Sequence, residues 1–341
     1  MDQATILYAG ATLLALTFAS CYAALVILSP PPRKAHPSER TYRSATSPTK
    51  PLPLGSIADP ASVDLSVIVP AYNETERLPV MLQAAIIHLK KPALKDRTYE
   101  FVIVDDGSSD DTAELALKFA ADSRRRDTNA GKGGAVRHGM LYGRGRRLLM
   151  VDADGASRFE DLELLWNEMD KIAPNEEASV VVGSRAHLVK TEAVVKRSLL
   201  RNVLMYGLHT ILRIVGVGHI RDTQCGFKLF SRAAAQSIFP YQHLATWIFD
   251  VELLLLAKQL RMPVAEVPIE WHEVSGSKLN VVTDSLQMLR DLLVLRANHL
   301  LGRWKVGPPQ AGTIVNDEYE FNCELTMISY IIRGLQALGT E

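Results

Sequence analysis

Two apolar runs of this sequence end in closely spaced aspartates, and this feature most constrains the fold. Residues 148–151 lead into Asp152 and Asp154, and a β-branched run leads into Asp105 and Asp106. Short apolar runs of this kind predict buried strands. Because residues i and i+2 of a strand point to the same side, Asp152 and Asp154 can converge on one ligand, naturally a hard divalent cation. Two acidic strand ends predict one site at the carboxyl edge of a sheet, where open α/β folds bind ligands.

Strand-like and helix-like segments alternate around these aspartates. An apolar repeat at helical spacing predicts a helix over Leu78–Leu89. A second helix is predicted over 112–121, opened by Ser109 or Asp110 as its N-cap. The predicted strands are residues 65–70, 101–104, 148–151 and 179–182. This alternation predicts an α/β fold with a mostly parallel sheet that is flanked by helices on both faces.

The first 29 residues predict a transmembrane anchor. Residues 6–28 form an uncharged stretch of 23 residues, which is long enough to span a bilayer as a helix. The alternative is a cleaved signal peptide, which would need a basic segment before the apolar stretch, whereas Asp2 is the only charged side chain there. Basic residues such as Arg33 and Lys34 follow the stretch, so the positive-inside rule places the rest of the chain in the cytosol.

Composition excludes several classes of function. Among the 341 residues, Lys and Arg together number 38 and so do Asp and Glu, so no overall charge points to nucleic acid. The three cysteines, Cys21, Cys225 and Cys323, are far apart and odd in number. They suggest neither a zinc site nor a disulfide framework, and they fit a reducing compartment.

The remaining segments differ in character. Residues 30–62 contain eight prolines and little apolar content, which predicts an extended linker. Residues 63–280 form the predicted globular domain. Residues 194–217 and 281–306 are apolar stretches interrupted by charges, and we expect amphipathic helices at the membrane interface, with ordinary packed helices as the alternative. The role of the tail, residues 307–341, stays open.

Three loops have residue types that suit a nucleotide. The loop after the first predicted strand can present Tyr72 and Glu74, and the carboxylates of Asp105 and Asp106 could bind a base imide and a ribose while Tyr72 stacks. Residues 129–137 are dense in glycine and include two cations, which suits an anion. The plainer alternatives are a turn with a helix cap and a flexible basic turn.

Six motifs then occur in a fixed order: V-I-V-P-A-Y-N-E, V-D-D-G-S-S-D-D-T, N-A-G-K-G-G-A-V-R, D-A-D-G-A, V-V-G-S-R and D-T-Q-C-G-F-K. Over about residues 63–305 the chain resembles the nucleotide-sugar glycosyltransferases of family 2, which have the Rossmann-like GT-A fold. D-A-D-G-A and the later W-H-E-V-S-G-S-K resemble the branch that transfers glucose to dolichyl phosphate in the endoplasmic reticulum.

The resemblance implies a role for each matching residue. Asp152 and Asp154 would bind Mg²⁺ or Mn²⁺. Some relatives have a third metal-side group where this chain has Ala156, so water or Gln224 could replace it. The residues implied to hold the uridine are Pro70, Ala71, Tyr72, Glu74 and Asp106, and Lys132 would lie near the nucleotide. Arg185 and Arg201 would lie near the acceptor phosphate. Asp222 and Gln224 would line the sugar and the reaction centre. For Arg201 a plain helix-surface position is the alternative.

The resemblance also implies an activity. The enzyme would transfer glucose from UDP-glucose to dolichyl phosphate with inversion, giving dolichyl β-D-glucosyl phosphate for lipid-linked oligosaccharide assembly in protein N-glycosylation. It would be a single-pass protein of the endoplasmic reticulum membrane whose catalytic domain faces the cytosol, and a homo-oligomer is compatible with this. Two alternatives stay open: a dolichyl-phosphate mannosyltransferase that uses GDP-mannose, and a catalytically silent membrane scaffold that keeps the fold.

Overall fold

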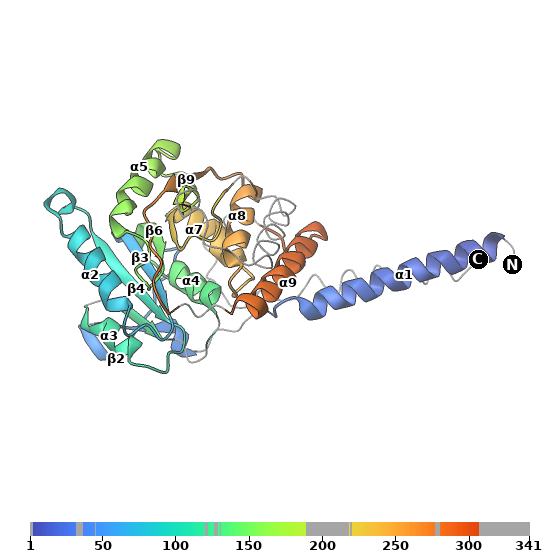
Figure 1. The fold of residues 1–341 in the computed structure, drawn as a ribbon, viewed down its shortest axis with the longest axis horizontal. Coiled ribbons are helices and arrows are strands. Elements are labelled where there is room, and N and C mark those ends of the chain that lie inside the picture. Colours follow the sequence, from blue (N-terminus) through green and yellow to red (C-terminus); the bar gives the residue numbers. More distant parts are fainter. Residues whose placement is uncertain are drawn as a thin grey trace.

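A nine-stranded sheet forms the centre of the protein, and one long helix projects from the body (Figure 1). The computed structural model describes residues 3–31, 37–44, 46–119, 122–125, 129, 131–188, 218, 220–276 and 280–306. Residues 194–217 and 307–341 lie outside the described residues, and so does Arg201, so the expectations for them stay predictions.

The strand order of the sheet is β2-β1-β5-β4-β3-β6-β8-β7-β9. Strands β5, β4, β3 and β6 are parallel to one another, and β7 is parallel to β9. Strand β8 is antiparallel to both β6 and β7, and β1 is antiparallel to both β2 and β5. The prediction of a mostly parallel sheet is therefore confirmed. The strands are β1 (Thr41–Ser44), β2 (Ser47–Pro53), β3 (Val63–Ala71), β4 (Tyr99–Asp105), β5 (Asp122–Arg125), β6 (Gly145–Val151), β7 (Val180–Ser184), β8 (Phe227–Ser231) and β9 (Val264–Pro268).

Helices cover both faces of the sheet, as the alternation predicts. Successive side chains of β6 point to opposite faces: Leu148 and Met150 join one core cluster, and Leu149 and Val151 join the other. The first cluster packs α4, α7, α8 and α9, and the second packs α2, α3 and α5. The helices are α1 (Gln3–Leu28), α2 (Leu78–Leu89), α3 (Thr112–Lys118), α4 (Lys132–Leu141), α5 (Leu162–Ile172), α7 (Arg232–Ile238), α8 (Phe249–Gln259) and α9 (Val281–Leu300), with short 3₁₀ turns η1 (Pro37–Arg40), η2 (Pro92–Leu94), η3 (Phe159–Asp161) and η5 (Phe239–Tyr241).

Helix α2 has the predicted bounds, whereas α3 differs at both ends. It begins at the predicted Thr112 but ends at Lys118, before residue 121. Its N-cap position is Asp111, so the prediction of Ser109 or Asp110 is wrong by at least one residue. Asp110 nevertheless accepts a hydrogen bond from the Thr112 amide at 3.1 Å, because a carboxylate two residues upstream reaches the first free N–H of a helix.

The predicted linker, residues 30–62, contains regular structure. Strands β1 and β2 pair as an antiparallel hairpin, and Arg43 of β1 pairs with Ser123 of β5. The expectation of an extended linker is therefore wrong for Thr41–Ser44 and Ser47–Pro53. Edge strands tolerate proline, since one side of their backbone needs no partner, and this explains why a proline-rich segment joins a sheet.

Among the described residues, one helix, α1, is long and apolar enough to cross a membrane. This fits the predicted anchor. Its side chains are largely exposed, with Leu7 and Leu14 more than two-thirds accessible. It leaves the body beside α9 (Figure 1). At this joint the Asn298 side-chain amide donates a hydrogen bond of 2.9 Å to the Ser29 hydroxyl, and Arg303 donates to the same oxygen at 3.3 Å.

Helix α9 has two apolar faces rather than one. Leu292 and Leu295 are fully buried against the body, as in an ordinary packed helix. On the other side, Leu286, Leu293 and Leu300 are 59–68% exposed and follow one another at heptad spacing. The expected membrane-interface helix and the alternative of an ordinary packed helix thus each describe one face of α9.

Two neighbouring leucines of α5 test the core. Leu165 is fully buried and Leu164 is 45% exposed. Leu165→Ala should lower the free energy of unfolding by about 2–5 kcal/mol, because it removes packed methyl groups and leaves a cavity. Leu164→Ala is the matched control and should change it by less than about 0.5 kcal/mol. Denaturant titration of both variants measures the difference, and equal losses would contradict the packing described here.

Candidate active site

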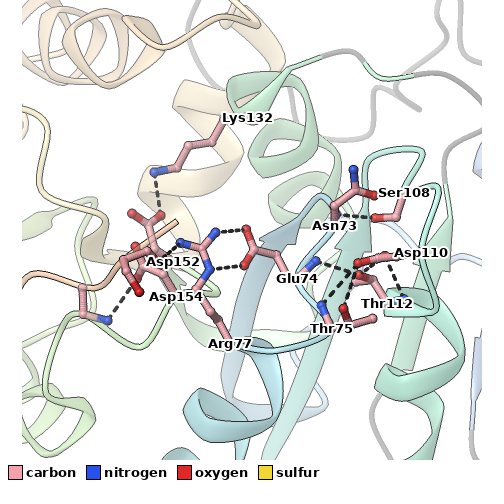
Figure 2. Close-up of polar contacts among 12 residues, drawn as sticks. Asn73, Glu74, Thr75, Arg77, Ser108, Asp110, Thr112, Lys132, Asp152 and Asp154 are labelled. Atoms are coloured by element: carbon pink, nitrogen blue, oxygen red, sulfur yellow. Dashed lines mark hydrogen bonds and ion pairs between the residues drawn. The ribbon is translucent and has the colours of Figure 1, made fainter. Parts of the chain in front are cut away.

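The two acidic strand ends lie at one edge of the sheet. Strands β4 and β6 flank β3 and run parallel to it, so their carboxyl ends meet on the same side. The loops after β3 and β6 bring Glu74 close to Asp152 and Asp154, and Lys132 reaches them from the start of α4 (Figure 2). The prediction of a common edge is therefore confirmed.

Asp152 and Asp154 lie next to each other at the end of β6 (Figure 2). The backbone N–H of Asp152 donates to the Gly226 carbonyl at 3.0 Å, and Asp154 accepts a hydrogen bond from the Ala156 amide at 3.0 Å. Burial, together with the neighbouring Asp152 charge, raises the pKa of Asp154 above its ordinary value. Two half-buried carboxylates in contact are unfavourable unless a cation balances them, so this pair favours a cation.

Lys132 supplies one such charge. Its ammonium Nζ lies 2.6 Å from Asp152 Oδ1. Burial would lower the pKa of Lys132, but the carboxylates of Asp152 and Asp250 outweigh burial and raise it, so the side chain stays cationic. Lys132 is the first residue of α4, and the preceding Gly131 amide donates to Asp106 at 2.9 Å.

Most of the glycine-dense segment 129–137 is helical rather than a turn. Gly133 and the residues after it belong to α4. A Cβ on Gly133 would lie 2.6 Å from the Phe249 Cβ, so this glycine permits close packing of two helices. Arg137 donates instead to the carbonyl of Phe239 at 3.0 Å, away from the aspartates. Lys132 is thus the cation of this segment that reaches the site.

The predicted uridine residues lie at the ends of β3 and β4. Pro70 and Ala71 end β3, and the following Tyr72 is 38% exposed. Asp106 is buried and accepts a hydrogen bond from the Gly131 amide. Asp105 differs, because its buried Oδ2 has no hydrogen-bond partner among the described residues. An unsatisfied buried carboxylate oxygen is costly, which makes Asp105 a stronger candidate acceptor than Asp106.

Glu74 contacts a residue that the sequence analysis missed. Arg77 donates to both Glu74 oxygens, at 2.7 and 2.6 Å (Figure 2). This bidentate pair holds the guanidinium beside the two aspartates, and its charge acts to lower the pKa of Asp154. The only sequence signal is the spacing of three residues between Glu74 and Arg77, which is common on helices.

Hydrogen bonds tie the loop after β3 to the loop after β4. The Asn73 amide donates to the Ser108 hydroxyl at 2.9 Å, and the Asn73 side chain accepts from the Ser109 amide at 2.8 Å. The Glu74 amide donates to the Thr112 hydroxyl at 2.8 Å. Asn73 has a positive φ of 53°, which asparagine tolerates better than most residues. The two loops therefore form one pre-organised wall (Figure 2).

Arg185 and Asp222 form a second bidentate ion pair, at 2.7 and 2.8 Å. Burial would raise the pKa of Asp222, but the Arg185 guanidinium outweighs it and lowers that pKa. The guanidinium carbon lies 5.4 Å from the ring centre of Trp271. Gln224 is half-buried, two residues before the Gly226 that contacts Asp152. The roles of Arg185, Asp222 and Gln224 stay predictions.

Behind Lys132 lies a buried ion pair that the sequence analysis also missed. Lys228 Nζ is 2.6 Å from Asp250 Oδ1 and 2.5 Å from the Cys225 carbonyl oxygen. Lys228 and Asp250 are almost fully buried. Burial raises the pKa of the Cys225 thiol to about 12, so this cysteine is protonated at neutral pH and is no nucleophile.

Among the described residues, no three His, Cys, Asp or Glu side chains gather as a metal-binding group. Asp152 and Asp154 thus stand as a pair, and the methyl group of Ala156 adds no ligand. Two carboxylates still fit Mg²⁺ or Mn²⁺, because such ions keep several waters and bind substrate phosphates.

Comparison with known proteins decides the family. The sequence model described as "Glycosyl transferase family 2" matches residues 66–239, about half of the chain, and this range includes Glu74, Lys132 and Asp152. The chain belongs to glycosyltransferase family 2. The resemblance noted in the sequence is thus confirmed.

Curated relatives within this family are similar over most of their length. The Saccharomyces cerevisiae protein named dolichyl-phosphate beta-glucosyltransferase is 44% identical over 315 residues, which cover 86% of this chain and 94% of the relative. The Homo sapiens protein of the same name is 41% identical and covers 89% of this chain and 96% of the relative.

Solved structures show the fold. Glucosyl-3-phosphoglycerate synthase from Mycobacterium tuberculosis, in complex with UDP, has a TM-score of 0.51 at 20% identity and covers 69% of this chain and 81% of its own. A complex of the same enzyme with Mn²⁺, UDP-glucose and phosphoglyceric acid has a TM-score of 0.50 at 18% identity and covers 69% of this chain and 80% of its own. The Rossmann-like GT-A fold expected for the family is confirmed.

A substitution at Gly226, the residue before β8, tests how closely the backbone packs on Asp152. A Cβ at this position would overlap the Asp152 carboxylate, so Gly226→Ala must displace it. We expect glycosyl transfer to fall at least about tenfold, which corresponds to about 1.4 kcal/mol of transition-state stabilisation. Steady-state kinetics and a melting curve check this. Gly10→Ala, with open space at its Cβ, is the control, and unchanged turnover in Gly226→Ala would contradict the role of the Asp152 position.

Proposed function

We propose that this protein transfers glucose from UDP-glucose to dolichyl phosphate, with inversion, and releases UDP. The observation that carries the proposal is the 44% identity, over 86% of the chain, to a relative named dolichyl-phosphate beta-glucosyltransferase. The cluster of carboxylates and cations at the sheet edge supports it, because a nucleotide diphosphate needs cations and its ribose and base need hydrogen-bond acceptors.

The wall formed by the loops after β3 and β4 would bind the uridine. Tyr72 is exposed enough to stack on the base, and Asp105 Oδ2 supplies a buried acceptor for the N–H of the uracil ring. The hydrogen bonds of Asn73 and Glu74 to the neighbouring loop hold this wall in place before the donor binds. Pre-organisation of this kind reduces the entropy lost on binding.

Asp152 and Asp154 would hold Mg²⁺ or Mn²⁺ against the diphosphate. When bound, such an ion stabilises the negative charge that develops on the departing UDP. Lys132 offsets part of the charge at Asp152, and Arg77 adds a guanidinium that Glu74 orients. The solved structure with Mn²⁺ and UDP-glucose belongs to an enzyme with the same fold, which supports a divalent ion here.

Direct displacement accounts for inversion. A phosphate oxygen of the acceptor would attack the anomeric carbon from the face opposite UDP, forming one C–O bond as the other breaks. The second pKa of a phosphate monoester is near ~6, so the acceptor is mostly ionised at neutral pH and needs no general base. Arg185, fixed by Asp222, would offset the acceptor's charge, and Arg201 would assist.

The membrane would supply the acceptor. Helix α1 fits an anchor, and the exposed Leu286, Leu293 and Leu300 of α9 form an apolar face beside the end of α1, suited to the interface of the bilayer. The similarity to proteins named dolichyl-phosphate beta-glucosyltransferase supports a place in the endoplasmic reticulum membrane. The catalytic domain would face the cytosol, because basic residues follow the span.

The donor assay tests the proposed function. Purified protein with dolichyl phosphate and Mg²⁺ should transfer glucose from UDP-glucose and no mannose from GDP-mannose. Asp154→Ala should lower transfer at least about a hundredfold, since it removes a carboxylate that would hold the divalent ion against the departing diphosphate. Preference for GDP-mannose would favour the mannosyltransferase, and UDP binding without turnover would favour the silent scaffold. Near-normal turnover of Asp154→Ala would contradict the metal assignment.

Protease accessibility tests the orientation. A protease added to intact microsomes should digest the domain that follows α1, because that domain is expected on the cytosolic face. Immunoblotting of the fragments measures the result, with a lumenal protein as the protection control. Full protection of the domain before detergent is added would refute the cytosolic orientation.

A further inference from the structure

A partly buried loop packs between α9, the helix beside the anchor, and the start of α4, the helix that carries Lys132. This loop, residues 242–248, joins η5 to α8. The side chains of Gln242, Leu244 and Ile248 are at most 5% exposed. None of these residues has a role in the chemistry proposed above, yet their contacts lead directly to the site.

One side of the loop holds the backbone around Lys132. Gln242 Nε2 donates to the Gly133 carbonyl at 2.9 Å, and the Gly134 amide donates to the Ala245 carbonyl at 3.3 Å. Gly131 has a φ of 88°, and a Cβ there would lie 2.6 Å from the Ala245 oxygen. The residues on both sides of Lys132 therefore contact the loop, so the position of the lysine follows that of the loop.

The other side of the loop is held by α9 and the residues after it. The Thr246 hydroxyl donates to Asp291 Oδ2 at 2.6 Å, and Asp291 is only 3% exposed. The His243 ring stacks on Trp304 with 4.1 Å between ring centres and 3° between planes. Figure 1 shows α4, α8 and α9 grouped on the side of the body from which α1 projects.

We propose that loop 242–248 is a positioning element through which α9 sets the place of Lys132 for a nucleoside diphosphate, with Thr246 and Asp291 as positioning residues. The proposal rests on the proposed function for the identity of the nucleotide. A shift of about 1 Å at a charged group can cost a large factor in rate or affinity, so a small movement of the loop matters. Because α9 lies beside the anchor, the position of Lys132 would depend on the side of the domain that faces the membrane.

Thr246→Val tests the proposal, because it removes one hydroxyl and keeps the volume. Asp291 remains paired with Arg290 at 2.7 Å, so no buried charge is left alone. We expect the Kd for UDP, measured by calorimetry, and the KM for UDP-glucose to rise about five- to tenfold, the range of one net hydrogen bond. The KM for dolichyl phosphate should stay unchanged.

Thr98→Val is the matched control. Its hydroxyl also donates to an aspartate, Asp64, at 2.7 Å, but before the start of β4, at the other end of the sheet. A loss of stability with an unchanged Kd for UDP is expected there. The same result in Thr246→Val would mean a merely structural role and would overturn the proposal.

A second variant probes the other end of the loop. Gln242→Leu removes the hydrogen bond to the Gly133 carbonyl and should also weaken UDP binding. If both residues act through one loop, the double variant should lose less affinity than the product of the single losses. Strict additivity would overturn the shared path. Wild-type protein that binds UDP but transfers no glucose would refute the proposed function alone, and wild-type protein that binds no UDP would refute both.

Discussion

The ion pair between Lys132 and Asp152 is the contact on which the site depends. It joins the start of α4 to the end of β6 over 2.6 Å and balances part of the charge of two adjacent carboxylates. Without a cation there, half-buried acids would repel each other or take up protons. Gly131, Gly133 and Gly226 lie around this pair at places where packed atoms leave no room for a Cβ, so the backbone itself is shaped around it.

The acidic part of the site could be predicted from the sequence because it follows strand ends. The rule that parallel strands end at one edge places Asp105 and Asp152 together without any coordinates. Arg77 and Asp250 could not be found in this way, because neither directly follows a strand: Arg77 is the N-cap position of α2, and Asp250 lies in α8. Asp106 was predicted as a ligand, and in the fold its carboxylate also accepts a hydrogen bond from the Gly131 amide, a contact that the sequence does not reveal.

The fold could be predicted from the sequence where apolar residues dominate an element. It could not be predicted where polar residues in an element are stabilised by partners from elsewhere in the chain. Helix α2 has the bounds that its apolar repeat predicts. Strand β8 was not predicted, because Lys228 interrupts its apolar run; in the fold this lysine is buried and paired with Asp250. Strand β5, Asp122–Arg125, has no apolar residue at all. The hairpin β1–β2 lies at an edge, where proline does not break a ladder, so its composition resembles that of a linker.

The joint at Ser29 has a mechanical consequence. Its hydroxyl accepts from Asn298 and Arg303 and donates to the Leu25 carbonyl at 2.7 Å, so every bonding position of that oxygen is in use one residue after α1 ends. The body thus contacts α1 directly at this joint, through α9 and the residues that follow it. The direction in which α1 leaves the body therefore depends in part on a single hydroxyl group, because Asn298 and Arg303 share it as their partner.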